Sequence, residues 1–329
     1  MRPNTNWLYR ANLSIRQTKA LAMVREGYEA QVELLVRAIP VVAEEPDFAL
    51  KGGTAINLFY RDMPRLSVDI DLTYIPLDDR KAALANIDSA FDRMVERAND
   101  TLPGINAQRI AGGGDGDTRI LLRSRDAAVK VEVSPVTRGT VGPTQIKRVT
   151  DKVEEAFGFA EMSVVAFEDL YAGKLCAALD RQHPRDLYDV ALLYENEGIT
   201  DGLFRTFLVY AACSKRPLHE IINPNMIDIE RPFIQEFEGM TAEPAPLAML
   251  CAARERLVND IQTRITGPAA DFLVSVHDGA PNFDIIGLAE SAKLPAIRWK
   301  LINLAKLKDE NPDKHALQRK ALEEAIANF

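Results

Sequence analysis

The spacing of apolar residues in the first fifty positions predicts a helix and then a short strand. Between residues 18 and 39 apolar residues recur three and four positions apart, as they do on one face of an α-helix. They are Leu21, Val24, Tyr28, Val32, Leu35 and Ile39. Pro40 predicts the end of this helix or a kink in it. Residues 48–50 are apolar and predict a strand, which a glycine pair turns into a helix that begins near Thr54.

Strict alternation of apolar and acidic residues follows in the next segment. Val68, Ile70 and Leu72 are apolar, and Asp69 and Asp71 lie between them. Because successive side chains of a strand point to opposite faces, this pattern predicts a strand over residues 68–74 with both carboxylates on one face.

Further periodic segments predict a long helix and three more strands. Apolar residues at helical spacing predict a helix from about Asp79 to about Ala98, and strands are expected over residues 105–110, 118–122 and 128–133. A glycine-rich run, AGGGDGD at residues 111–117, separates the first two of these strands. It fits neither the dinucleotide-binding nor the P-loop pattern, so a hairpin turn is the better interpretation.

The alternating pattern disappears after Phe167, and helical segments follow one another to the last residue. The expected helices cover residues 167–181, 184–197, 201–212, 244–266 and 295–307, with a last one from Pro312. A chain of 329 residues is long enough for two domains. The sequence therefore predicts an α+β fold: a catalytic domain at residues 1–166, with a mixed sheet flanked by helices, and an all-helical domain at residues 167–329.

Composition and charge exclude several classes of protein. The chain is 47% hydrophobic and 27% charged, and it has no apolar run long enough for a membrane span and no secretory signal. Three widely spaced cysteines (Cys176, Cys213 and Cys251) indicate a reducing compartment, so we expect a cytoplasmic protein. A net charge of −8 argues against non-specific coating of nucleic acid. Residues 293–320, with eight basic and three acidic side chains, are a candidate basic groove or else a solvated helix surface.

The acidic strand is the strongest chemical signal in the chain. Two carboxylates side by side repel each other unless a cation lies between them, which indicates a site for Mg²⁺ or Mn²⁺ that carries a nucleotide's phosphates. Glu132 alternates with Val131 and Val133 and is the candidate third carboxylate, as a metal ligand or as the acceptor of a proton. Taken alone, Glu132 fits a solvent-facing position on a sheet better, and only the presence of Asp69 and Asp71 upstream favours the functional role.

Residues on either side of that strand are candidates for binding phosphate. The glycines of the strand-to-helix turn let backbone N–H groups approach a phosphate, and a hydroxyl at the next position can donate to it or cap the helix. The nucleotide-binding candidates in this region are Lys51, Gly52, Gly53, Thr54, Arg65 and Ser67.

A second charged cluster lies at residues 170–190. Lys174 is in an apolar helix and must lie at the edge of a buried face or point into a cleft, where it would neutralise triphosphate charge. Arg181 and Asp186 follow at the next helix junction, together with Asp189. The alternative is structural: the two aspartates would favour the N-terminus of their helix and Arg181 would pair with them.

These two segments together resemble the AbiEii-type toxins of type IV toxin–antitoxin systems, which include the mycobacterial MenT enzymes. The matching stretches are KGGTAINLFYRDMPRLSVDIDL (51–72) and LYAGKLCAALDRQHPRDLYDV (170–190). The resemblance implies the DNA polymerase β-like nucleotidyltransferase superfamily, with Asp69 and Asp71 binding metal, Thr54 as the phosphate-loop hydroxyl, and Lys174 and Asp186 as essential residues. It also implies an NTP substrate, transfer to an acceptor that in some relatives is the tRNA 3′ end, and an AbiEi-like antitoxin partner.

Two other functions fit the same residues. The first keeps the chemistry and changes the acceptor to a hydroxyl of a protein or a small molecule. The second is a non-catalytic binding module on a transferase scaffold. Retention of Asp69, Asp71, Lys174 and Asp186 argues against the second, because a site without catalysis has no reason to keep like charges together.

Overall fold

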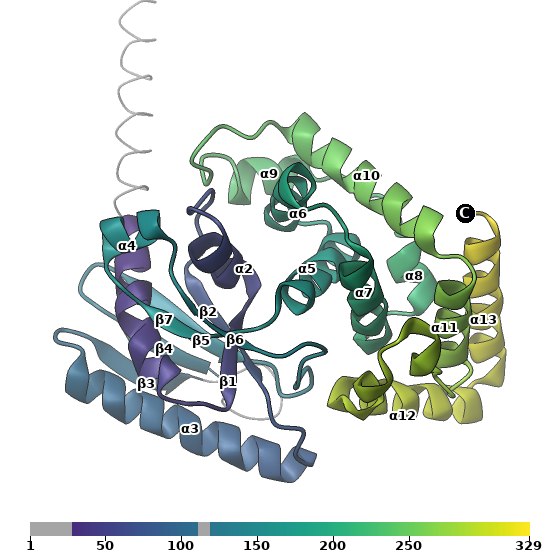
Figure 1. The fold of residues 1–329 in the computed structure, drawn as a ribbon, viewed down its shortest axis with the longest axis horizontal. Coiled ribbons are helices and arrows are strands. Elements are labelled where there is room, and N and C mark those ends of the chain that lie inside the picture. Colours follow the sequence, from purple (N-terminus) through teal and green to yellow (C-terminus); the bar gives the residue numbers. More distant parts are fainter. Residues whose placement is uncertain (1–27, 111–118) are drawn as a thin grey trace, which may run out of the picture.

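The computed structural model describes residues 28–110 and 119–329. The N-terminal part of the first expected helix and the glycine-rich turn lie outside these residues. The described chain forms one mixed seven-stranded sheet, followed by a series of helices (Figure 1). The predicted α+β class is confirmed.

The sheet places the acidic strand near its centre. The strands are β1 (Phe48–Lys51), β2 (Asp69–Tyr74), β3 (Asn106–Ile110), β4 (Arg119–Arg123), β5 (Ala128–Val133), β6 (Gln145–Arg148) and β7 (Glu161–Val164), in the order β3-β4-β5-β2-β1-β7-β6. Strand β2 pairs antiparallel with β1 and parallel with β5. The first five strands were expected within about two residues, and β6 and β7 were not expected.

Two helices cover the sheet near β3 and β5. Helix α3 (Arg80–Thr101) is capped by Asp79, whose side chain accepts hydrogen bonds from two backbone N–H groups of the first turn. Beside it lies a helix that is described from residue 28 to residue 43. The helix does not end at Pro40 but continues for three more residues, and the alternative of a kink there stays a prediction. Val41 and Val42 are buried there, and their burial offsets the hydrogen bond that proline removes.

The second half of the chain is helical, as expected. After the short α4 (Asp151–Phe157), the helices are α5 (Phe167–Arg181), α6 (Pro184–Asn196), α7 (Asp201–Cys213), α8 (Leu218–Ile222), α9 (Glu230–Glu236), α10 (Leu247–Arg264), α11 (Pro268–His277), α12 (Pro295–Glu310) and α13 (Pro312–Ala327). All six expected helices are present, and α8, α9 and α11 are additional. Within the described residues no strand follows β7.

The core extends from the sheet into the helices. Buried apolar side chains of the two regions, among them Leu50 in β1, Leu175 in α5 and Leu257 in α10, belong to one continuous cluster. The start of α5 coincides with the expected boundary at residue 166, but the division into two domains stays a prediction. None of the helices described has the length and apolar character that crossing a membrane requires.

Candidate active site

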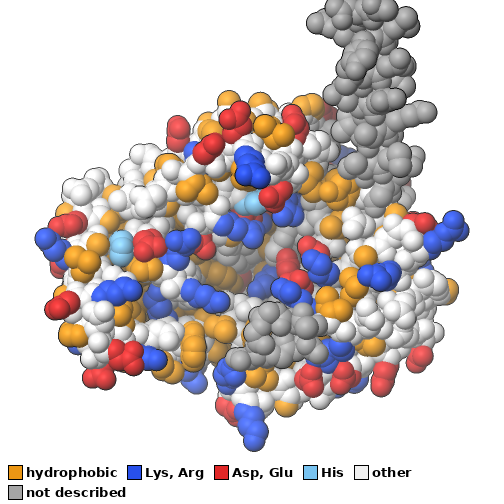
Figure 2. Space-filling model, turned by 180° about the vertical axis from the view of Figure 1, so that it is seen from behind, with side chains coloured by type: hydrophobic (Ala, Val, Ile, Leu, Met, Phe, Trp, Pro, Cys, Tyr) orange, Lys and Arg blue, Asp and Glu red, His pale blue; other side chains and the backbone are white. Residues whose placement is uncertain are grey.

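A cleft of about 620 Å³ lies between the sheet and the helices. Its walls come from β1 and β2, from residues 137–141, and from α5, α6 and the end of α7. The expected site residues that line it are Lys51, Gly52, Gly53, Arg65, Ser67, Asp69, Asp71, Lys174, Arg181 and Asp186. Figure 2 shows a hollow on the rear face of the molecule, with Lys and Arg side chains around it. The fold thus brings the acidic strand and the distant basic helix to one cavity.

Strand β2 presents its two carboxylates to this cleft. Asp69 and Asp71 both line it, whereas Ile70 between them is fully buried in the core. Asp71 lies opposite Lys51 of β1 and Glu132 of β5. Because residues opposite one another share a face of the sheet, a basic and two acidic side chains form one row across it.

The charges in this row perturb each other. Burial raises the pKa of Asp71 above its ordinary value of 3.8, and repulsion from Asp69 and Glu132 raises it further. Lys51 acts in the opposite direction on Asp71, but its own pKa is lowered by burial. The excess of negative charge is the environment that a divalent cation would relieve, so the pair Asp69 and Asp71 fits a Mg²⁺ or Mn²⁺ site.

Glu132 lies beside Asp71 but does not line the cleft. Its carboxylate is paired with Arg119 of β4, with 3.2 Å between Oε1 and Nε. Among residues 28–110 and 119–329, no three His, Cys, Asp or Glu side chains form a group that could hold a metal ion. Metal binding by Asp69 and Asp71, and the role of Glu132 as a third ligand or proton acceptor, therefore stay predictions.

The glycine turn differs from the expectation. Helix α2 (Gly52–Ala55) begins at Gly52 rather than near Thr54 and continues into a π-helical turn, η1 (Ile56–Tyr60). Thr54 does not cap the helix, because Lys51 occupies the N-cap position. The Thr54 hydroxyl is fully buried and donates to the backbone oxygen of Asp69 at 2.5 Å. It fixes the start of β2, and its expected contact with phosphate stays a prediction.

Gly52 leaves room for the Asp71 carboxylate. Its φ is +76°, and a Cβ atom there would lie 2.5 Å from Oδ2 of Asp71. We expect Gly52→Ala to lower the free energy of unfolding by about 1–3 kcal/mol and to displace the carboxylate. Urea denaturation measures the loss. Gly104→Ala is the matched control, since Gly104 has a φ of +75° and open space around its Cβ position. Equal losses in both variants would show that the contact with Asp71 is unimportant.

Ion pairs link five side chains along one wall of the cleft. They are Arg65, Asp189, Lys174, Asp186 and Arg181. Arg65 donates two hydrogen bonds, of 2.7 and 2.6 Å, to the two carboxylate oxygens of Asp189. The Nζ atom of Lys174 lies 2.9 Å from Asp189 and 2.7 Å from Asp186. Arg181 completes the series, with a bond of 2.5 Å from Nε to Asp186. Positive and negative charges alternate through this network.

The network keeps Lys174 charged although it is buried. Burial alone would lower the pKa of Lys174, but Asp186 and Asp189 outweigh it and the pKa is raised. Burial would likewise raise the pKa of Asp186, but Lys174 and Arg181 hold it well below its ordinary value. An ammonium group has three donors, and the two carboxylates take two of them. One donor is left for a ligand in the cleft.

Asp189 is the residue of this network that the sequence did not assign to the site. It was interpreted as favouring the N-terminus of its helix, but its side chain is fully buried between Arg65 and Lys174. The available signal was its spacing of three residues from Asp186, which places both on one helix face. Arg65 is itself only 3% exposed, so it holds Asp189 and contributes little free surface to the cleft.

The candidate basic groove at residues 293–320 is largely neutralised. Lys293, Lys306, Arg319 and Lys320 pair with nearby acids on the same surface. Lys300 is buried and donates to the backbone oxygens of Ser214 and Arg216 at the end of α7. These contacts favour the interpretation as a solvated helix surface.

Comparison with known proteins agrees with this geometry. The fold is similar to that of MenT4, a nucleotidyltransferase toxin from Mycobacterium tuberculosis, with a TM-score of 0.57 and 16% identity over 84% of this chain and 92% of that one. A comparison with curated proteins finds no match. The model of the family described as "Nucleotidyl transferase AbiEii toxin, Type IV TA system" matches residues 33–301. The chain therefore belongs to the AbiEii family of nucleotidyltransferase toxins.

Proposed function

We propose that this toxin transfers a nucleotide from an NTP to the 3′ end of tRNA in a reaction that depends on a divalent cation. The observation that carries the proposal is that Asp69, Asp71 and Lys174 line one cleft. Carboxylates for a metal and a fixed cation for phosphate are the two requirements of phosphoryl transfer. The acceptor is taken from the family resemblance, in which some relatives modify tRNA.

In this proposal Asp69 and Asp71 hold Mg²⁺, or Mn²⁺ in its place. When bound there, the ion would neutralise phosphate charge and lower the pKa of a hydroxyl group. Lys174 and Arg181 face the triphosphate from the opposite wall, and the Gly52–Gly53 turn lets the backbone approach it. Ser67, beside Gly53, presents a hydroxyl to the same cleft. Arg65 positions Lys174 through Asp189.

The proposed reaction is a single displacement at phosphorus. The oxygen of the acceptor 3′-hydroxyl forms a bond to the α-phosphorus, and the bond from that phosphorus to the oxygen bridging to the β-phosphate breaks. Pyrophosphate leaves and the hydroxyl proton passes to water or to a carboxylate. Glu132, whose Oε1 is paired with Arg119, is one candidate carboxylate for this proton.

The test uses each of the four NTPs, labelled at the α-phosphate, with Mg²⁺ and either total tRNA or total protein. We expect label in tRNA from the wild type, and none when EDTA is added or when Lys174 is replaced by methionine. Label in protein alone would overturn the tRNA assignment, and no label in any fraction would overturn the transfer reaction.

Membership of a type IV system implies an antitoxin partner, so we further propose that co-expression of an AbiEi-like antitoxin relieves growth arrest by the wild type.

A further inference from the structure

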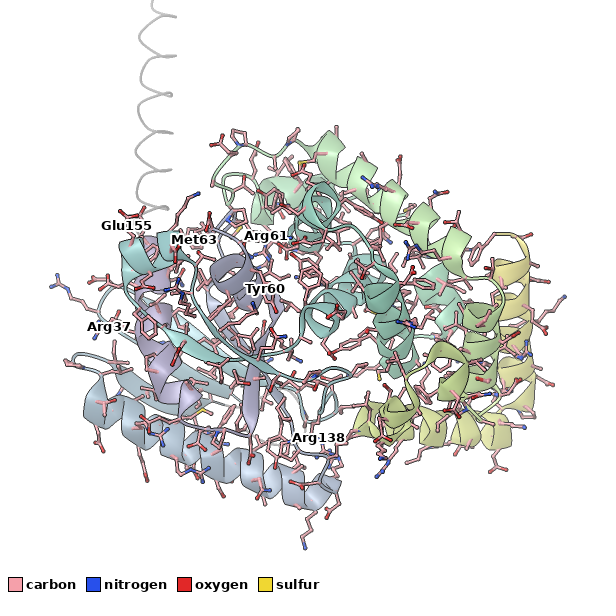
Figure 3. All side chains as sticks on the ribbon, in the orientation of Figure 1. Arg37, Tyr60, Arg61, Met63, Arg138 and Glu155 are labelled. Atoms are coloured by element: carbon pink, nitrogen blue, oxygen red, sulfur yellow. The ribbon has the colours of Figure 1, made fainter. Side chains whose placement is uncertain are left out.

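Arg138 is a buried arginine at one end of the cleft that the reaction described above does not use. It lies in the segment between β5 and β6, lines the cleft and is only 5% exposed. One terminal nitrogen donates to the backbone oxygen of Asp78 at 3.2 Å. Its Nε has no hydrogen-bond partner among the residues that the structure describes. Figure 3 shows Arg138 between the end of the sheet and the start of α12.

The segment that carries Arg138 is held from three sides. The N–H of Gly139 donates to the backbone oxygen of Tyr74 at 2.8 Å. Asp169 of α5 accepts bonds of 2.7 Å from the N–H groups of Val141 and Gly142. Gly139 has a φ of +77°, and a Cβ atom there would meet Leu77 at 2.5 Å. The position of Arg138 is therefore set before any ligand binds.

The charge of Arg138 is not balanced by a neighbouring carboxylate. Burial lowers its pKa, and the nearby acids Asp78 and Asp79 oppose this only in part. Asp78 accepts hydrogen bonds from Tyr74 and Asn86, and Asp79 caps helix α3. In the described part of the chain, neither acid forms an ion pair with Arg138. A buried cation without a partner destabilises a fold, so its retention in a ligand cleft indicates that a ligand supplies the negative charge.

The position along β2 indicates which ligand this is. Asp69, Asp71 and Thr73 line the cleft in sequence, and Arg138 lies beyond them, beside Tyr74. A rise of about 3.3 Å per residue separates Asp71 from that end by roughly 10 Å. The ion-pair network lies at the other end, where Arg65 and Ser67 precede the strand. In an in-line displacement the attacking group and the leaving pyrophosphate lie on opposite sides of the reacting phosphorus.

We propose that Arg138 binds a backbone phosphate of the acceptor strand, next to the 3′-hydroxyl that receives the nucleotide. This inference rests on the proposed function and adds the chemical class of the acceptor: an anionic nucleic-acid end rather than a protein hydroxyl. Arginine suits this role because its planar fork donates two parallel hydrogen bonds to a phosphate.

The test measures transfer of labelled nucleotide by the wild type and by Arg138→Gln, with RNA and NTP varied separately. We expect KM for RNA to rise roughly 10- to 100-fold, the range of a charge-assisted hydrogen bond, with KM for NTP unchanged. The slope of log affinity for single-stranded RNA against log salt should become shallower by about 0.7, the value for one lost phosphate contact. Arg125→Gln is the matched control, because Arg125 is 94% exposed and outside the cleft.

Two outcomes with Arg138→Gln overturn the inference. A rise in KM for NTP alone assigns Arg138 to the nucleotide, and no change in either KM makes it a structural residue that holds Asp78. If Arg138→Gln does not fold, Arg138→Lys keeps the charge and loses the fork. A KM for RNA that is at least threefold higher then supports the inference, and an unchanged one overturns it. A wild type that labels no RNA refutes the proposed function itself and is visible before any variant is compared.

Discussion

Replacing Asp71 with asparagine should reduce nucleotide transfer by about 10³-fold or more, a loss of about 4 kcal/mol of transition-state stabilisation. The substitution keeps the shape of the side chain and removes one of the two negative charges that β2 presents to the cleft. Labelled-NTP transfer at saturating Mg²⁺ measures the loss. Asp126→Asn, a change at a side chain that is 74% exposed, is the control and should leave transfer unaffected.

The Asp71→Asn variant should be at least as stable as the wild type at pH 7 in the absence of metal. The pKa of Asp71 is raised in the folded protein, so between its ordinary value of 3.8 and the raised value the folded state binds more protons than the unfolded state. Stability therefore falls as pH rises through that interval, and at pH 7 the Asp71 carboxyl group destabilises the fold. Urea denaturation tests this sign. Normal transfer by Asp71→Asn, or a clear loss of stability, would refute the assignment of Asp71 as a strained metal ligand.

The acidic site was predictable because its geometry is local. Alternation along β2 is enough to place Asp69 and Asp71 on one face, and the matching alternation of β5 places Glu132 on a neighbouring strand. The pairing of Glu132 with Arg119 was not predictable, because it depends on the register of β4 against β5. The alternation of residues within β5 does not show which residues of the neighbouring strand β4 lie opposite them.

Strand β6 was missed because its residues do not bury an apolar face. Three of the four residues of β6 are exposed, so no alternation marks it as a strand. Helix α2 begins at two glycines, which are poor helix formers, and contacts with α5 and β2 override that propensity. The sequence predicted a start near Thr54 because propensity was the only information it offered. Tertiary contacts decide both cases.

Replacing Asp189 with asparagine should lower the free energy of unfolding by about 3–5 kcal/mol, because Arg65 and Lys174 would remain buried without their shared carboxylate. The pKa of Asp189 is held below its ordinary value of 3.8, so the stabilisation is complete above that value and is lost as pH falls through the folded pKa. Urea denaturation at pH 7 measures the cost. Asp278→Asn, which breaks the exposed pair with Arg319, should cost less than about 1 kcal/mol.

A double-mutant cycle separates the ion pair from the packing around it. Lys174→Met removes one of the two cations that Asp189 neutralises, so the loss caused by Asp189→Asn should be smaller in the Lys174→Met background by about 1–3 kcal/mol. If the two losses simply add, Asp189 acts through its fit in the core and not through charge. Coupling between the two substitutions would show that Asp189 acts on Lys174 through its charge. Asp189 also binds Arg65, 124 residues away in the sequence, so it would link the segment before β2 to helix α5. Through that link α6 would help to determine where Lys174 lies.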